Sequence, residues 1–509
     1  MTINESFVSF KKEQFRAVAS EVLKGNTGLI QPGIKLPSTE PFIMKRIACI
    51  LSLLAGFCLI SFPVLAQEAE AASGASAPAA EAAAPAEETA NEPDVLNGAN
   101  TAWILTATAL VLFMTIPGLS LFYAGLVGRK NVLSVLMHCF MITAIMSVLW
   151  VVCGYSIALG TENPYWGGLG NIFAKGINAD NFSGAGSESI PEFLVFGFQM
   201  TFFIITPALM VGAFVERMKF SAMILFTSLW ALLVYAPVCH WVWAGGESGD
   251  PTNGFMYEWG TFDLAGGIVV HITAGIGALA ACIMVGPRKG YPTAQFQPHS
   301  LPLCVTGTGM LWVGWFGFNA GSQLAANGAA AQTLVVTHIS AATATIIWSL
   351  CEKVKHGKAS VLGAVTGAIA GLAAITPASG HVGPMGALAI GAASGFICWY
   401  ASTAVKSKFG YDDSLDVVGV HGVGGLVGTL LVAFFAAEAL GGTEGAKYDM
   451  AGQFWIQLGS SAITIVYTLI VSVIILYLVK AICGGSLRVS ESEEVEGLDL
   501  TAHGESGYN

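Results

Sequence analysis

The fifth apolar stretch of the chain begins Asp263-Leu-Ala-Gly-Gly-Ile-Val-Val-His271, and the tenth begins Asp416-Val-Val-Gly-Val-His421-Gly-Val-Gly-Gly. Each stretch has an acid at its start, then glycine, then a histidine inside the apolar run. At about 1.5 Å of rise per residue, His271 lies about 12 Å along its helix from Asp263. If the two stretches cross a membrane in opposite directions, the histidines meet near its middle. The repeated pattern predicts a chain whose second half is an inverted copy of the first.

The composition predicts a membrane protein. Of the 509 residues, 54% are hydrophobic and only 11% are charged, and the mean hydropathy is +0.66. Soluble domains carry about 25% charged residues. The 61 glycines suit helices that pack closely in lipid. No basic stripe indicates nucleic acid, and the ten scattered cysteines predict neither a disulfide framework nor a metal cluster.

Eleven stretches approach the roughly 20 residues that a bilayer crossing needs. They lie near 99–124, 132–160, 191–215, 220–243, 262–285, 301–320, 330–351, 360–376, 384–404, 419–437 and 453–480. With the first stretch entering from outside, thirteen Lys and Arg fall in the inner connections and tail, and only Lys175 and Lys447 fall outside. We therefore predict an all-α polytopic protein, N-out and C-in, with eleven transmembrane helices. Two inverted five-helix repeats and an eleventh helix form its membrane domain, residues 99–482.

The N-terminal part is composite. Met44-Lys-Arg, an apolar run from Ile47 to Leu65 and the small residue Ala66 predict a signal peptide over 44–66. Our hypothesis is that translation starts at Met44 and cleavage follows Ala66, so that 1–43 is a misassigned or untranslated extension. Residues 67–98 are rich in Ala, Glu and Pro and are expected to be a disordered outer tail. A cleaved signal and many spans place the protein in the bacterial inner membrane.

Ionisable residues inside a membrane are costly and usually functional. His271 and His421 are therefore candidate pore residues, whereas His138 and His338 are interpreted as hydrogen-bonded packing residues. The nine histidines show no HxH, HxxH or HxxxH spacing, which argues against a metal site. The absence of GxSxG argues against nucleophilic hydrolysis, and the absence of TVGYG against a potassium channel. We expect neither an enzyme nor a cofactor.

Aromatic residues gather toward the outer side of the predicted bundle. Phe198 and Phe202 lie four apart, on one face of the third stretch. Trp243 ends the fourth stretch on the outer side, and Ser322 follows the sixth there. Aromatic faces with one hydroxyl acceptor suit a small cation that donates hydrogen bonds. Periodicity alone fits a lipid-facing belt or a packed core equally well.

Longer motifs carry a resemblance to a known family. They are Phe-Met-Thr-Ile-Pro-Gly-Leu-Ser-Leu-Phe-Tyr-Ala-Gly (113–125), Arg-Lys-Asn-Val-Leu (129–133), Glu216-Arg217, 263–271, Gly-Trp-Phe-Gly-Phe-Asn-Ala-Gly-Ser (314–322) and 416–421. From about Asn100 to the C-terminus, the chain resembles the ammonium transporter, methylammonium permease and Rhesus (Amt/Mep/Rh) family, on its bacterial Amt branch.

The resemblance implies where ammonium, or its analogue methylammonium, is handled. Phe198, Phe202, Trp243 and Ser322 would recruit the ion, and Phe202 and Phe318 would form the gate beneath them. His271 and His421 would share a proton in the pore with Trp315 nearby, while buried Asp263 would shape the outer site. The family also implies a homotrimer with one pore per subunit.

Magnitudes favour a particular transport mechanism. A bare monovalent ion in a low-dielectric interior costs on the order of 20 kcal/mol, whereas a desolvated cation–π contact returns about 2 kcal/mol. We expect ammonium to lose its proton, cross as ammonia through a hydrophobic pore and send the proton along His271 and His421. The alternatives are an ammonium sensor or transceptor, and a Rhesus-like neutral gas channel, which the Trp243 and Asp263 motifs disfavour.

The C-terminal segment, 483–509, contains Gly485-Ser-Leu-Arg488 and the stretch Glu496 to Gly504. It resembles the family's cytoplasmic regulatory tail, which implies packing on neighbouring subunits and a PII-type signalling partner at the inner pore mouth. Composition alone would favour a flexible, solvated chain.

Overall fold

The structure is a computed structural model that describes residues 95–178, 180–184 and 189–508. The predicted extension (1–43) and signal peptide (44–66), and most of the predicted outer tail (67–98), lie outside the described residues. The described part is helical apart from a short antiparallel pair of strands, β1 (Phe182–Ser183) and β2 (Ile190–Pro191).

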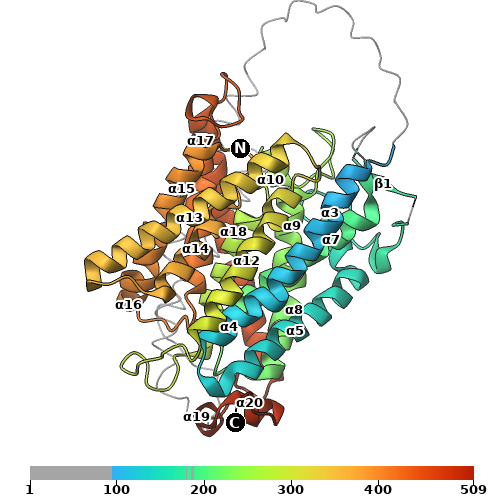
Figure 1. Cartoon of the computed structure of the whole chain (residues 1–509). Coiled ribbons are helices and arrows are strands. Elements are labelled where there is room, and N and C mark those ends of the chain that lie inside the picture. The colour runs from blue at the N-terminus through green and yellow to red at the C-terminus, as the bar shows by residue number, and fades with distance from the viewer. Residues whose placement is uncertain (1–94, 179, 185–188, 509) are drawn as a thin grey trace, which may run out of the picture. The chain divides into compact units, whose positions relative to one another are not determined.

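The apolar stretches form helices in the predicted order (Figure 1). The first five spans contain α3 (Gly98–Phe113), α4 (Ser120–Leu126), α5 (Val132–Leu149), α6 (Tyr155–Leu159), α7 (Glu192–Phe214), α8 (Phe220–Trp230), α9 (Ala236–Trp243) and α11 (Thr273–Val285). The rest contain α12 (Leu301–Gly321), α13 (Gly328–His356), α14 (Val361–Ile375), α15 (Pro384–Tyr400), α16 (Lys406–Phe409), α17 (Val423–Phe435) and α18 (Met450–Ile482). Short helices in the connections are η2 (Arg129–Asn131), η4 (Ile172–Ala174), α10 (Phe255–Glu258) and η10 (Glu438–Leu440).

Length separates one of these helices from the others. Among the described residues, ten helices are long and apolar enough to cross a membrane. The eighth predicted stretch, 360–376, forms α14, which is apolar but only 15 residues long. The polytopic all-α class is confirmed, while eleven crossings and the N-out orientation stay predictions.

Wider π-helical turns open the fifth and the tenth span, where they are η7 (Gly267–Ile272) and η9 (Val418–Gly422). Further π-turns lie in the first, second, fourth and ninth spans: η1 (Met114–Leu119), η3 (Trp150–Gly154), η6 (Ala231–Tyr235) and η8 (Ala401–Val405). π-turns are rare and gather at functional sites. The matching positions of η7 and η9 therefore point to the fifth and tenth spans.

The fifth and tenth spans meet almost backbone to backbone. A Cβ atom added at Gly275 would lie 2.3 Å from the Cα atom of Gly422. One added at Gly425 would lie 2.7 Å from both the carbonyl oxygen of Gly267 and the Cβ atom of His271. Glycine at these positions therefore lets the two histidine-bearing helices approach each other.

The eleventh helix, α18, ties the two halves together. The Gln457 side chain accepts a hydrogen bond from the Phe262 amide at 2.8 Å and donates to the Phe262 carbonyl at 2.7 Å. The Nε2 atom of Gln457 also donates to the carbonyl of Thr429 on α17 at 3.0 Å. One buried side chain thus holds both the segment that precedes the fifth span and the body of the tenth.

The C-terminal segment is docked on loops of its own chain. It forms α19 (Glu491–Glu496) and α20 (Leu498–His503), which lie at the end of the bundle near the start of α5 (Figure 1). The Val489 amide donates to the Arg217 carbonyl at 3.0 Å, and the Ser134 amide to the Asp499 carboxylate at 2.8 Å. This packing favours a docked tail over a flexible, solvated one.

The glycine contact predicts an unequal response to two similar substitutions. Gly275→Ala should lower the midpoint of thermal unfolding in detergent, because the added methyl group overpacks the interface by about 1 to 3 kcal/mol. Gly309→Ala on α12 is the matched control, since a Cβ there meets nothing within 4 Å; alanine's helix propensity should leave it unchanged or slightly stabilised. Equal midpoints for the two variants would contradict the close approach.

Candidate functional site

Asp263 closes the start of the fifth span. Its Oδ1 accepts the amides of Gly266, at 3.0 Å, and Gly267, and its Oδ2 those of Ile268 and Val269 at 2.8 and 3.1 Å. The residue is 5% exposed, so four otherwise orphaned N–H groups and one negative charge satisfy one another at a helix N-terminus. The carboxylate is already saturated, as expected for a residue that shapes the site without touching a ligand.

Aromatic rings converge beside this cap. The ring centroid of Phe202 on α7 lies 5.0 Å from that of Phe198 and 5.7 Å from that of Trp243, and both pairs meet edge to face. The Phe202 ring stacks on that of Phe318 of α12, with the centroids 4.2 Å apart. Phe198, Phe202 and Phe318 are buried, whereas Trp243 is half-buried. Trp243 is fixed because its Nε1 donates to the Asp263 carbonyl at 2.7 Å. The rings face one another, so a lipid-facing belt is excluded for this group.

Ser322 completes the outer end of α12. Its hydroxyl donates to the Phe318 carbonyl at 2.8 Å, and the side chain is half-buried. A hydroxyl whose hydrogen is committed keeps its oxygen lone pairs available. The residue therefore offers a hydrogen-bond acceptor next to the backbone of Phe318.

The two histidines meet as predicted. The Nδ1 atoms of His271 and His421 are 3.3 Å apart, and the rings stack with centroids 5.3 Å apart. Both residues are buried, at 1% and 3% exposure. A hydrogen bond at this contact requires that one Nδ1 donates while the other accepts. The Nε2 of His271 has no hydrogen-bond partner among the described residues.

Rings connect the outer cluster to this pair. His271 lies 6.2 Å from Phe318 and 5.5 Å from Trp315, which stacks beside it. The Trp315 Nε1 donates to the Thr376 hydroxyl at 2.8 Å. Phe202, Phe318, His271 and His421 thus form a continuous column. The role of Thr376 was not predicted. Its partner Trp315 lies 61 positions away in the sequence, and no local sequence pattern identifies such a pair.

The acid paired with His421 differs from the expected one. Asp416 does not cap the tenth span: it has φ +60° and forms an ion pair with Lys406 at 2.7 Å. Asp413 does, because its Oδ2 accepts the Val418 amide at 2.7 Å. Asp413 precedes His421 by eight residues, as Asp263 precedes His271. The shared eight-residue spacing could have identified Asp413 from the sequence. It was missed because Asp413 lies outside the apolar stretch, whereas Asp416 adjoins it.

The two histidines interpreted as hydrogen-bonded packing residues, His138 and His338, also depart from expectation. His138 is buried and stacks on Phe220 at 5.7 Å, yet neither of its ring nitrogens bonds to any residue that the structure describes. His338 is exposed on α13, with its ring 5.3 Å from that of Trp312. His138 is therefore a packed, buried residue as predicted, but it lacks the predicted hydrogen bonds.

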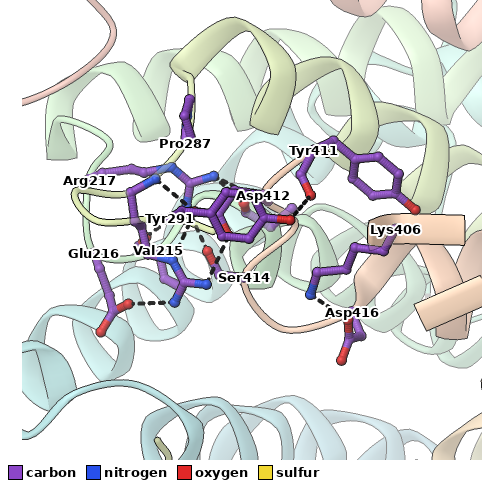
Figure 2. A network of polar contacts seen from close by, with 12 residues as sticks. Val215, Glu216, Arg217, Pro287, Tyr291, Lys406, Tyr411, Asp412, Ser414 and Asp416 are labelled. Carbon is purple, nitrogen blue, oxygen red and sulfur yellow. Dashed lines mark hydrogen bonds and ion pairs between the residues drawn. The ribbon is translucent and has the colours of Figure 1, made fainter. Parts of the chain in front are cut away.

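A polar network fixes the loop that leads into the tenth span (Figure 2). Arg217 donates to the Gly286 carbonyl at 2.7 Å, to the Ser414 hydroxyl at 2.6 Å and to the Asp412 carbonyl. Arg288 bridges the carboxylates of Asp412 and Glu216 at 2.8 and 2.9 Å. Burial alone would raise the pKa of Asp412. The adjacent Arg288 and Arg217 lower this pKa by more than burial raises it, so the pKa of Asp412 lies below its usual range. The loop is therefore held by charged hydrogen bonds on both sides of Asp413.

Comparisons with known proteins agree on one family. Residues 102–508 match the model of the Ammonium Transporter Family. The chain is 45% identical to an ammonium transporter of Aquifex aeolicus, covering 81% of this chain and 94% of that protein. It is 43% identical to an ammonium transporter of Bacillus subtilis, covering 79% and 96%.

Solved structures give the same answer for the fold. A structure titled "Sensor Amt Protein" matches with a TM-score of 0.72 at 28% identity, covering 80% of this chain and 98% of that one. Saccharomyces cerevisiae Mep2 matches with a TM-score of 0.69 at 32% identity, covering 78% and 89%.

The saturated cap predicts a graded loss of stability. Asp263→Asn keeps one acceptor oxygen and Asp263→Ala keeps none, and each buried N–H left without an acceptor costs about 1 to 3 kcal/mol. The midpoint of thermal unfolding in detergent should fall in the order wild type, Asn, Ala. Asp449→Ala, which removes a single-bond cap from the exposed start of α18, should cost only about 1 kcal/mol. An Asp263→Ala protein no less stable than Asp449→Ala would contradict the role of the cap.

Proposed function

The chain belongs to the ammonium transporter family, and from that membership we propose that it takes up ammonium across the bacterial inner membrane through the column of rings between Phe198 and His421. The contact that carries the proposal is the 3.3 Å approach of the His271 and His421 Nδ1 atoms. It lies directly below a stacked aromatic pair, Phe202 and Phe318.

Recruitment is the first step of the proposed cycle. An ammonium ion at the outer end meets the faces of Phe198, Phe202 and Trp243 and donates a hydrogen bond to Ser322. Each ring contributes about 0.5 to 2 kcal/mol, depending on how far the ion is desolvated. The half-buried Trp243 and Ser322 support this role, because both are within reach of solvent while the phenylalanines are buried.

Deprotonation follows from the size of the dehydration penalty. A few ring contacts return only a small part of the roughly 20 kcal/mol that a bare ion loses in a dry interior. The stacked rings of Phe202 and Phe318, 4.2 Å apart, leave no hydrated path between them. Ammonium therefore gives up its proton above the gate, and neutral ammonia passes when the gate rings rotate.

The histidine pair provides the path for the proton. A shared proton on facing Nδ1 atoms can move from one ring to the other without either ring changing place. The Nε2 of His271, unbonded among the described residues, can accept the next proton. Trp315, held by Thr376, keeps His271 in the stacked orientation that this transfer needs.

A sensor or transceptor is the second candidate. It is favoured by the likeness to a structure titled "Sensor Amt Protein" and by the docked C-terminal tail. A Rhesus-like gas channel that carries only neutral ammonia is the third. The three differ in what they move: charge and nitrogen for the transporter, nitrogen alone for the gas channel, and neither for a pure sensor.

Assembly and regulation extend the proposal. We propose a homotrimer with one pore per subunit and a PII-type signalling protein at the cytoplasmic face. The tail supports a regulatory surface, because it contacts three inner loops of its own chain. Arg488 donates to the Pro287 carbonyl at 2.6 Å, and the Leu498 amide donates to Asn131 at 2.8 Å.

The proton path predicts loss of current without its histidines. In proteoliposomes, His271→Ala/His421→Ala should reduce the ammonium-evoked current to the level of empty liposomes, because positioned proton donors and acceptors contribute about 100-fold or more. His338→Ala, which removes an exposed histidine from α13, should keep the wild-type current. A selective current from the double variant would rule out the relay. Wild-type protein that gives internal alkalinisation but no current would instead indicate a gas channel.

Recruitment predicts a separate effect on affinity. Trp243→Leu should raise the ammonium concentration for half-maximal current about 5- to 30-fold, the equivalent of 1 to 2 kcal/mol of cation–π energy. Trp243→Phe keeps a ring face but loses the bond to Asp263 and should show a smaller rise. Trp259→Leu, which removes an exposed ring directly after α10, serves as the control. Equal affinities for the Leu and Phe variants would show that the ring face contributes nothing.

A further inference from the structure

The two capping aspartates occupy equivalent positions but are not equally satisfied. Asp263 accepts four backbone N–H groups on its two oxygens. Asp413 accepts the Val418 amide on Oδ2, while its Oδ1 has no hydrogen-bond partner in the part of the chain that the structure describes. Asp413 is only 1% exposed. An unsatisfied buried carboxylate oxygen is costly to maintain and calls for an explanation.

The free oxygen does not come from a loosely held loop. Arg217 holds the residues on either side of Asp413, through the Asp412 carbonyl and the Ser414 hydroxyl (Figure 2). Arg288 holds the Asp412 side chain, and the Leu415 amide donates to the Gly212 carbonyl at 3.0 Å. Two arginines therefore fix the backbone around Asp413 but leave its own carboxylate free of a cation.

The surroundings leave the Asp413 carboxyl able to change its protonation state. Tyr123, Cys282, Lys406, Tyr411 and Asp416 are the titratable groups around it. Lys406 donates its hydrogen bond to Asp416 rather than to Asp413. Burial raises the pKa of Asp413 to about 6, although Lys406 opposes the shift. The group can thus take up and give up a proton near neutral pH.

We propose that Asp413 is the inner proton acceptor of this transporter, a role that rests on the proposed histidine relay. The imidazolium of His421 releases its proton and becomes neutral imidazole, and the free Oδ1 of the Asp413 carboxylate receives that proton and becomes a carboxylic acid. The acid then releases the proton to inner water, where ammonia takes it up as ammonium. Asp263 cannot act in this way, because both of its oxygens are saturated.

Geometry places the acceptor beyond direct reach of the histidine. The Asp413 carboxylate lies at the Val418 amide, three residues before His421 in the tenth span, and no hydrogen bond joins it to the His421 ring among the described residues. The proton therefore travels over hydrogen-bonded water between them, and Asp413 gives the path a fixed inner end. Its place next to the arginine-rich loops puts that end on the side that the Lys and Arg count assigns to the cytoplasm.

The test uses an isosteric substitution and two readouts in proteoliposomes. Asp413→Asn keeps an oxygen for the Val418 amide but cannot carry a proton. We expect its ammonium-evoked current to fall at least tenfold, while neutral ammonia still enters without its proton, so that internal alkalinisation rises above the wild-type level. Asp416→Asn is the matched control, because its amide oxygen still accepts from Lys406; it should keep the current.

A pH profile adds a readout that a purely structural role would not move. The wild-type current should rise as the inner pH increases through about 6, since only the carboxylate accepts a proton. The residual current of Asp413→Asn should show no such rise.

Three results would overturn the proposal. A wild-type current from Asp413→Asn would do so and would leave the histidine relay standing, provided that His271→Ala/His421→Ala still loses its current. Loss of ammonia uptake together with current would assign Asp413 a structural role. No specific current from the wild-type protein would remove the relay itself and this proposal with it.

Discussion

Two helices meet backbone to backbone where Gly275 faces Gly422, and the central site depends on that approach. A side chain at Gly275 would push the helices apart, and the Nδ1 atoms of His271 and His421 would no longer lie 3.3 Å apart. In lipid, such close contact is a main source of helix association, because apolar side chains gain little by leaving an apolar solvent. The packing of the two helices and the contact between the histidines therefore depend on the same few glycines.

The π-turns are the second consequence of this arrangement. Both η7 and η9 carry one of the paired histidines, and each begins close to an aspartate that accepts at least one of its amides. A helix that starts inside the bundle leaves N–H groups that water cannot reach, and a carboxylate can accept several of them at once. An aspartate caps the start of both the fifth and the tenth span, but only Asp263 has both carboxylate oxygens hydrogen-bonded among the described residues. The difference between a saturated and an unsaturated cap gives two equivalent positions different chemistry.

Much of the fold followed from the sequence, because hydropathy and charge are local signals. The order of the helices and the polytopic class were predicted from the apolar stretches, and the meeting of His271 with His421 from their matching positions in two stretches that run in opposite directions. The eighth stretch, 360–376, agrees with α14 to within one residue at each end, because Ser360 before it and Thr376-Pro377 after it bound the apolar run. The acid partner of His421 was placed at Asp416 because it adjoins the apolar stretch, whereas the cap is formed by Asp413 after the chain turns back.

What escaped prediction depends on partners distant in the sequence. Thr376 orients Trp315, Gln457 joins Phe262 to Thr429, and the tail lies on loops more than 190 residues away. The last of these bears directly on Asp413. Arg488 donates to the Pro287 carbonyl, Arg288 follows Pro287 and binds Asp412, and Asp412 precedes Asp413. The docked tail thus favours the loop arrangement that fixes Asp413, so that one network sets both the position of the tail and the position of the proposed proton acceptor.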